Sequence, residues 1–256
     1  MTAWRDKKEN IEQLKAEHTP DAIQQRLHYG YRHSYLRDFI YGAIDGVVTT
    51  FAVVSGVAGA NLSAKIIIIL GIANLIGDGF SMAVSNFLGT RADEQQRQQA
   101  IKEEELHIQK IPEGEREEIR QIFAAKGFTG KNLERAVKII TSDSQLWVNT
   151  MLREELGMVI EGPSAIRAAL STFVAFVLIG SLPLLAFIYQ WLFPDVHFDP
   201  FLVSSIMTGI AFFSVGALKA PFIGHRWYLS GLETFLVGVC AALLAYTAGI
   251  LLRGIV

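Results

Sequence analysis

The chain has 256 residues, 51% of them hydrophobic, with a formal net charge of -2 and a mean hydropathy of +0.31. No basic patch interleaved with aromatic residues stands out, which argues against a nucleic-acid partner, and a single cysteine, Cys240, excludes a disulfide framework. Only five of the 23 Lys and Arg residues and five of the 25 Asp and Glu residues lie outside 1–38 and 91–161. This segregation of charge predicts a membrane protein with a soluble insertion.

The first segment, 1–37, is polar and has no apolar core of the signal-peptide type. We expect it to be partly helical, to lie at a surface and to stay in the cytoplasm. Insertion into the membrane must then use internal apolar runs.

Five internal runs are long and apolar enough to cross a bilayer, which takes about 20 residues of helix. They are 39–60, 66–88, 168–193, 201–218 and 228–252. The predicted fold is therefore all-α and polytopic, with five transmembrane helices, two in 38–90 and three in 162–256. Most basic residues that flank these runs fall on one side of the membrane under this topology, although Lys65 and Arg253 do not. The positive-inside rule places that side, with the N-terminus and segment 91–161, in the cytoplasm.

Segment 91–161, between the second and third spans, is polar and contains several helix boundaries. Pro112 suits the first turn of a helix, and Gly127 suits the position just past its end. Ser142 and Gln145 have the spacing of a capping box ahead of another helix. We expect a small helical domain whose first helix continues from the second span without a break.

Two carboxylates lie deep in the first two spans, Asp45 and Asp78. A charge in the hydrocarbon costs about 2.5 to 3.5 kcal/mol on insertion scales, so such a residue normally faces a polar cavity or a partner. Each is therefore a candidate functional residue, and the alternative is an aspartate near the interface that reaches water. Beside Asp45, Gly42 and Gly46 form a GxxxG pair, which favours close approach of helices.

The second span carries a stripe of side chains that bind metals. Asn74, Asp78 and Met82 recur every four residues and so share one face of a helix. In the first span, Asp45 and Thr49 are likewise one turn apart. If the two stripes face one another, they supply oxygen ligands and one sulfur, a set that suits Fe(II) or Mn(II).

The insertion carries a second candidate site, made of pairs that each project from one face of a helix. The pairs are Glu104 with His107, Glu115 with Glu118, and Met151 with Glu155. Three such pairs, with oxygen, nitrogen and sulfur donors, favour a metal site, whereas a solvated acidic surface is the usual alternative. Spacing alone leaves neighbouring carboxylates as substitutes: Glu103, Glu105, Glu113, Glu117 and Glu154.

The sequence contains no Walker motif, no GxSxG and no Cys/His nucleophile pair. We therefore expect no enzyme and no cofactor, and any transport must be driven by gradients. One alternative is a membrane-anchored di-iron oxidase, because Glu104 and His107 have the ExxH spacing of ferritin-like sites, although that fold needs two such pairs. A metal sensor that binds without transport is another. Glu233 in the fifth span suits a snorkelling side chain as well as a proton path.

Three motifs in order, LRDFIYGAIDGVVTTFAVVSGVAGA, GDGFSMAVSNFLG and WVNTMLREELGM, make the chain resemble the vacuolar iron transporter family from about Leu36 onward. The resemblance implies a homodimer that exports cytosolic Fe(II), and often Mn(II), into a vacuole or across the plasma membrane in exchange for protons. It implies a pathway at the dimer interface lined by Asp45 and Met82. It also implies that the insertion binds metal through these ligands: Glu104, Glu115, Glu118, Met151 and Glu155.

Two residues depart from plant-type members of that family. Asn74 stands where they carry a glutamate, with Asp78 one turn later, and His107 stands where they carry another. The pattern resembles the prokaryotic branch, so we expect a bacterial or archaeal plasma membrane, or a vacuolar membrane in a eukaryote. Only neutral imidazole binds metal, so His107 should make capture depend on pH. The expected partners are Fe2+ or Mn2+, protons, the lipid bilayer and a second copy of the chain.

Overall fold

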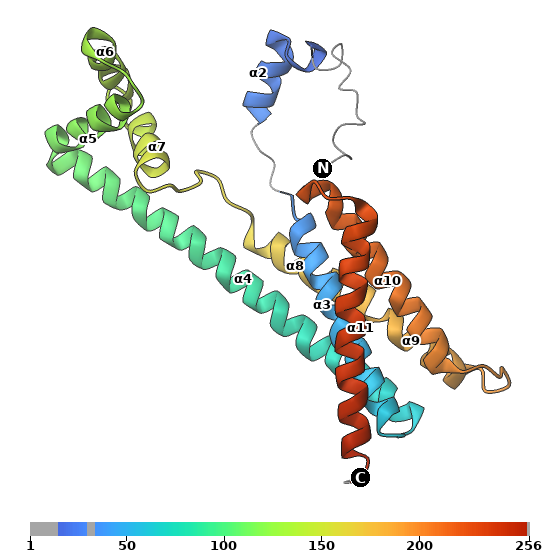
Figure 1. The fold of residues 1–256 in the computed structure, drawn as a ribbon. Helices are drawn as coiled ribbons and strands as arrows, with labels where there is room; N and C mark the ends of the chain where they lie inside the picture. Colours follow the sequence, from blue (N-terminus) through green and yellow to red (C-terminus); the bar gives the residue numbers. More distant parts are fainter. Residues whose placement is uncertain (1–14, 30–33, 255–256) are drawn as a thin grey trace. The chain divides into compact units, whose positions relative to one another are not determined.

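The computed structural model describes residues 15–29 and 34–254, and these residues form helices joined by short loops (Figure 1). The helices are α2 (Pro20–Tyr29), α3 (Leu36–Gly59), α4 (Ala64–Lys110), α5 (Pro112–Ala125), α6 (Gly130–Ile140), α7 (Ser144–Glu154), α8 (Ala165–Gly180), α9 (Leu182–Leu192), α10 (Pro200–Ile223) and α11 (Trp227–Leu252). No strand occurs among the described residues, so the all-α prediction is confirmed. The predicted N-terminal segment contains α2, while 1–14 and 30–33 lie outside the described residues.

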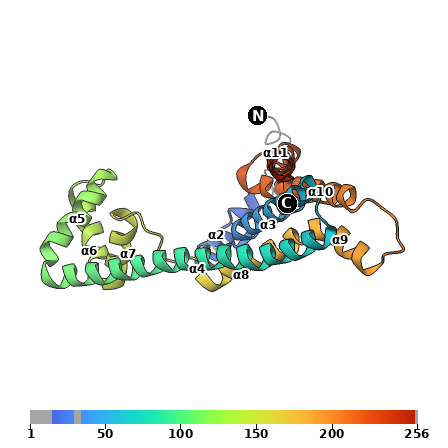
Figure 2. The same cartoon turned by 90° about the horizontal axis from the view of Figure 1, so that it is seen from below.

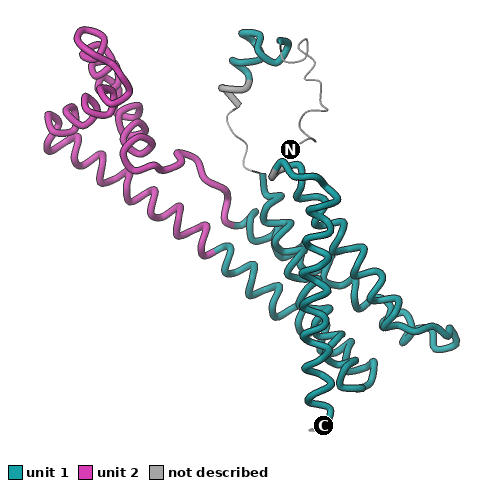
Figure 3. Tube along the Cα trace, in the orientation of Figure 1, with its two compact units in different colours: residues 1–87, 166–256 teal, residues 88–165 magenta. Residues whose placement is uncertain are grey.

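The chain divides into two compact units (Figure 3). The first, residues 1–87 and 166–256, contains the long apolar helices and is called the membrane unit below. The second, residues 88–165, is called the insertion unit. Helix α4 contributes to both, because it runs for 47 residues without a break. The prediction that the second span continues into the first helix of the insertion is therefore confirmed.

Four helices are long and apolar enough to cross a bilayer, namely α3, α4, α10 and α11. Helices α8 and α9 meet that test only as a pair, which is bent by 49°. Among the described residues there are thus four candidate spans, or five if the bent pair is one. The predicted single helix over 168–193 is wrong in this respect. Pro183 in the first turn of α9 has no N–H to donate across the break, and its carbonyl accepts a hydrogen bond from Ser204 of α10 at 2.6 Å.

Helix α3 is the centre of the membrane unit, with α10 and α11 beside it (Figures 1 and 2). Its Gly42 and Gly46 face the backbone of α8, and a Cβ atom at Gly46 would lie 2.5 Å from the carbonyl oxygen of Phe176. The close approach predicted at this GxxxG pair is confirmed. Toward its other end, Gly59 meets the backbone of Tyr246 in α11 in the same way.

The insertion unit is held together by apolar side chains from its short helices. Its larger cluster consists of Ile119, Val137, Ile140, Trp147 and Met151. Pro112 lies in the first turn of α5 and Gly127 follows its end with a φ of 92°, as predicted. The predicted capping box is wrong, because Asp143 caps α7 by accepting a hydrogen bond from the Leu146 N–H at 2.8 Å. Ser142 instead donates its hydroxyl to the Ile139 carbonyl of the preceding helix.

Candidate functional site

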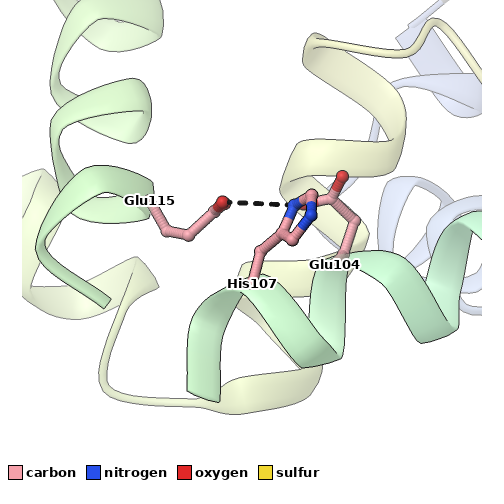
Figure 4. A group of neighbouring side chains, drawn as sticks. All are labelled: Glu104, His107 and Glu115. Atoms are coloured by element: carbon pink, nitrogen blue, oxygen red, sulfur yellow. Dashed lines mark ion pairs between the residues drawn. The ribbon is translucent and has the colours of Figure 1, made fainter. Parts of the chain in front are cut away.

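Three of the predicted ligands of the insertion converge (Figure 4). Glu104 and His107 lie one turn apart near the end of α4, and Glu115 lies in the first turn of α5. One ligand atom from each lies within 4.8 Å of the others, and Nδ1 of His107 is 3.5 Å from Oε1 of Glu115. The single residue Ile111 separates the two helices, so the sharp break at that point sets the first turn of α5 against the last turns of α4. Three donors this close together could hold a metal ion.

Glu104 and Glu115 are buried, and their one cationic neighbour among the described residues is His107, which carries a charge only when it is protonated. Glu104 is 6% exposed and Glu115 is 2% exposed, and the Oε2 atom of each has no hydrogen-bond partner among the described residues. Burial raises the pKa of Glu104 to about 7, and repulsion by Glu115 adds to the effect. Burial also raises the pKa of Glu115, with a further contribution from Glu118. An unpartnered buried carboxylate is costly, and a cation supplies the missing charge.

The remaining predicted ligands lie in different surroundings. Glu118 and Glu155 are exposed, but both are close enough to Glu104 to repel its carboxylate. Burial and the charge of Glu118 raise the pKa of Glu155 as well. Met151 is fully buried and belongs to the apolar cluster around Ile119. The structure therefore gathers the four glutamates and the histidine into one electrostatic group and sets the methionine in the adjoining core.

Most of the neighbouring carboxylates that spacing left open are exposed and engaged elsewhere. Each of four forms a hydrogen bond or ion pair with a nearby side chain: Glu103 with Gln99, Glu113 with Arg116, Glu117 with Arg120 and Glu154 with Lys126. Glu105 is exposed. An exposed carboxylate keeps its hydration and carries no burial cost for a metal ion to relieve, unlike a buried one. The geometry thus favours the buried glutamates over these neighbours.

The two polar stripes of the membrane unit face one another. The Asn74 amide of α4 donates hydrogen bonds to the hydroxyls of Thr49 (3.2 Å) and Thr50 (3.3 Å) of α3. The Thr49 hydroxyl in turn donates to the backbone carbonyl of Asp45 at 2.9 Å. One turn along, Asp45 is half-buried and interacts electrostatically with Asp78. The stripes therefore meet as a row of oxygen-bearing side chains between α3 and α4.

Two members of the α4 stripe differ in their exposure. Asp78 is exposed, even though it lies on a helix long and apolar enough to cross a membrane. Met82 is half-buried and packs against the apolar cluster that includes Val47 and Phe176. The sulfur predicted as a ligand thus belongs to a side chain that also fills the core.

The row extends beyond the predicted residues. The Asn86 amide of α4 donates to Oδ1 of Asp38 at 2.9 Å and to the Thr172 hydroxyl of α8 at 2.8 Å. Sequence reasoning missed these residues, because Asp38 follows Arg37 at the start of the first span, where charged residues are ordinary. The signal was present nevertheless. Asp38 precedes Asp45 by two helical turns, and Asn86 follows Met82 by one.

Glu233 of α11 has a basic partner. Its carboxylate pairs with Nζ of Lys219 on α10 at 3.2 Å. An exposed pair of this kind contributes little to stability, but it neutralises a charge on an apolar helix. The contact gives Glu233 a basic partner and does not decide between the two interpretations stated from the sequence, a snorkelling side chain and a proton path.

Comparison with known proteins gives consistent matches. Residues 36–250 match the VIT family. The chain is 30% identical to the vacuolar iron transporter of Toxoplasma gondii, over 96% of this chain and 86% of that protein. It is 31% identical to vacuolar iron transporter 1 of Arabidopsis thaliana, over 82% of this chain and 83% of that protein. It is 28% identical to the vacuolar iron transporter of Plasmodium berghei, over 88% and 85% of the two chains.

Proposed function

Because this chain belongs to the VIT family of membrane metal transporters, which are not enzymes, we propose that it exports Fe(II), and also Mn(II), from the cytosol in exchange for protons. The names of its relatives support iron as the substrate. The oxidase alternative has less support, because only one carboxylate and histidine group of metal-binding geometry occurs among the described residues.

The observation that carries this proposal is the pair of buried carboxylates, Glu104 and Glu115, each with one oxygen that has no hydrogen-bond partner among the described residues, next to the imidazole of His107. Carboxylate and imidazole together suit Fe(II) and Mn(II). In this proposal the insertion unit lies in the cytoplasm and captures the ion there. The proposed ligand set is completed by residues of the same group and the adjoining core: Glu118, Met151 and Glu155.

The row between α3 and α4 provides the proposed path through the membrane. It consists of Asp45, Thr49, Asn74, Asp78 and Met82. Two neighbouring carboxylates repel one another when both are charged, and either a proton or a divalent cation relieves that repulsion. Competition between the two for Asp45 and Asp78 is the proposed basis of exchange.

We propose that two copies of the chain assemble around this path. Asp78 is exposed on α4, and a charged group facing lipid costs about 2.5 to 3.5 kcal/mol on insertion scales. A second copy that covers this face removes the cost and encloses the row. The N-terminus is proposed to be cytoplasmic by the positive-inside rule. The membrane is proposed to be a bacterial or archaeal plasma membrane, or a vacuolar membrane in a eukaryote.

Flux measured in sealed proteoliposomes tests the proposal. With an acidic lumen and external Fe(II) or Mn(II), we expect metal to accumulate inside while the luminal pH rises. Collapse of the pH gradient with a protonophore should abolish the accumulation. Metal binding without flux in vesicles that contain correctly folded protein would support a metal sensor instead.

His107 is expected to set the metal preference of the insertion. Imidazole favours Co(II) over Mn(II) more strongly than a carboxylate does, so His107→Glu should lower the ratio of Co(II) to Mn(II) affinity by about tenfold, the scale on which metal sites respond to such changes. Titration calorimetry on the full chain measures both affinities. His197→Glu, on an exposed loop, is the matched control and should leave the ratio unchanged. An unchanged ratio in His107→Glu would remove His107 from the site.

A further inference from the structure

The polar row between α3 and α4 contains a third pair of facing residues. Thr49 faces Asn74 and Asp38 faces Asn86 through hydrogen bonds, and Asp45 interacts with Asp78 between them. Along α3 the three residues are Thr49, Asp45 and Asp38, at steps of four and seven toward the N-terminus. Along α4 their partners are Asn74, Asp78 and Asn86, at steps of four and eight toward the C-terminus. The two sets of steps differ by one residue at most, which is the register of two antiparallel helices packed side by side. The Asp38 and Asn86 pair therefore belongs to the same row as the proposed path.

The hydrogen bonds at this pair fix the orientation of the Asn86 carboxamide. The Thr172 hydroxyl is 1% exposed and donates its hydrogen to the Ala168 carbonyl at 3.1 Å. Its oxygen must then accept from Asn86, and the Asp38 carboxylate can only accept when it is charged. Both neighbours thus require the NH2 group of Asn86, and this network settles which way the amide points.

We propose that Asp38 and Asn86 form an additional binding station for divalent cations, in which Asn86 changes which atom it presents. Without a cation, the NH2 group of Asn86 holds the Asp38 carboxylate. When a cation binds Asp38, the carboxamide turns over and presents its oxygen, which is the ligand a hard or borderline cation accepts. Of the α4 residues in the row, Asn86 is nearest in sequence to the insertion unit, so this station is the first one along α4. The inference rests on the proposed metal transport.

Asp38 and Asn86 have the access and the chemistry that a station requires. Both are only half-buried, so an ion can reach them. The carboxylate supplies charge, and the amide is bound to acceptors on two other helices, Asp38 of α3 and Thr172 of α8. The simpler explanation is that Asn86 only ties these three helices together. The two explanations differ in which atom of Asn86 matters, because a tie uses the NH2 group and a ligand uses the oxygen.

Two substitutions of similar size separate these explanations. Asn86→Asp keeps an oxygen ligand and loses the donor, while Asn86→Leu loses both. We expect Asn86→Asp to retain Mn(II) flux in proteoliposomes within about threefold of the parent, and Asn86→Leu to lose at least about tenfold, the scale of one lost charge-assisted contact. Asp38→Asn should lose flux to a similar extent. Elution as a single folded species in detergent and an unchanged Mn(II) affinity of the insertion unit confirm that each variant is intact.

Gln190 provides the matched control, because its amide donates to the Phe198 carbonyl within the membrane unit. Gln190→Glu and Gln190→Leu should behave alike, since each removes only a structural donor. If Asn86→Asp and Asn86→Leu reduce flux equally, Asn86 only holds the three helices together through its NH2 group. The inference is then wrong, while the proposed transport stands. If Asp38→Asn transports at the parent rate, the station is also excluded. If the intact parent shows no flux with any metal, the proposed function itself fails.

Discussion

Replacing Asp45 with asparagine is expected to lower Fe(II) and Mn(II) flux at least about tenfold, the scale of one lost charge-assisted contact. The substitution keeps the size of the side chain and removes the charge that would bind the cation and carry the proton. The hydrogen bonds of Thr49 do not depend on that charge, because Thr49 donates to the backbone carbonyl of Asp45 and not to its carboxylate. A neutral residue also costs less in a membrane. Loss of flux should therefore occur in a protein at least as stable as the parent.

The measurement is metal uptake by proteoliposomes with equal amounts of each variant, together with Mn(II) binding to the insertion unit. Binding should be unchanged in Asp45→Asn, which separates the path from the site of capture. Glu233→Gln is the matched control, because it removes a carboxylate from another apolar helix where Lys219 neutralises it. Its flux should stay near that of the parent. Parental flux in Asp45→Asn would exclude Asp45 from the path.

Glu104→Gln is expected to stabilise the metal-free insertion unit at pH 7.5 and to abolish its gain of stability from Mn(II). The charged carboxylate of Glu104 is buried with an unpartnered oxygen, so the neutral amide removes a cost in the absence of metal. The same charge is what a cation needs. A glutamate with a structural role alone would not combine higher metal-free stability with loss of stabilisation by Mn(II). Its removal would instead destabilise the unit and leave the response to metal intact.

The raised pKa of Glu104 also predicts how stability depends on pH. Its pKa is about 7 in the folded chain and 4.5 when it is exposed, so the folded state binds more protons between these values. Stability of the metal-free insertion unit should then fall as pH rises from about 4.5 to 7, whereas Mn(II) binding should strengthen over the upper part of that range. Glu104→Gln should flatten both dependences.

Hydrogen exchange of the full chain, followed by mass spectrometry over residues 100–155, measures these local stabilities without dissecting the protein. Glu103→Gln provides the control, because Glu103 is exposed and only accepts a hydrogen bond from Gln99. It should change neither the response to pH nor the response to Mn(II). Destabilisation of the metal-free unit by Glu104→Gln would contradict the proposed role of Glu104.

The helical membrane architecture was predictable because apolar runs of sufficient length have few other solutions. The break between α8 and α9 was missed because hydropathy scores only the side chains of the run, although Pro183, which has no N–H to donate, was a signal for it. At the start of α7, both Ser142 and Asp143 are residue types that favour the N-cap. The Ser142 hydroxyl is bound to the Ile139 carbonyl of the preceding helix, so the Asp143 carboxylate makes the cap.

The candidate sites were predictable to different extents. Helical spacing placed Glu104 and His107 on one face, but burial of Glu104 and not Glu103 depends on where α5 begins and how it turns. Spacing within α3 and α4 gave the stripes, while their facing one another required the tertiary contact between Asn74 and Thr49. Asp38 was overlooked because an aspartate beside an arginine at a helix start has an ordinary explanation.

The backbone contact between α3 and α8 restricts how the membrane unit can move. Gly42 and Gly46 bring the two helices together with no side chain between them, so neither helix can slide or roll on the other without a clash of main-chain atoms. We therefore expect α3, with Asp45, and α8, with Thr172, to move together. In the proposed transport, a change that opens Asp45 to one side of the membrane would then involve displacement of α3 and α8 together, or of α4 away from them.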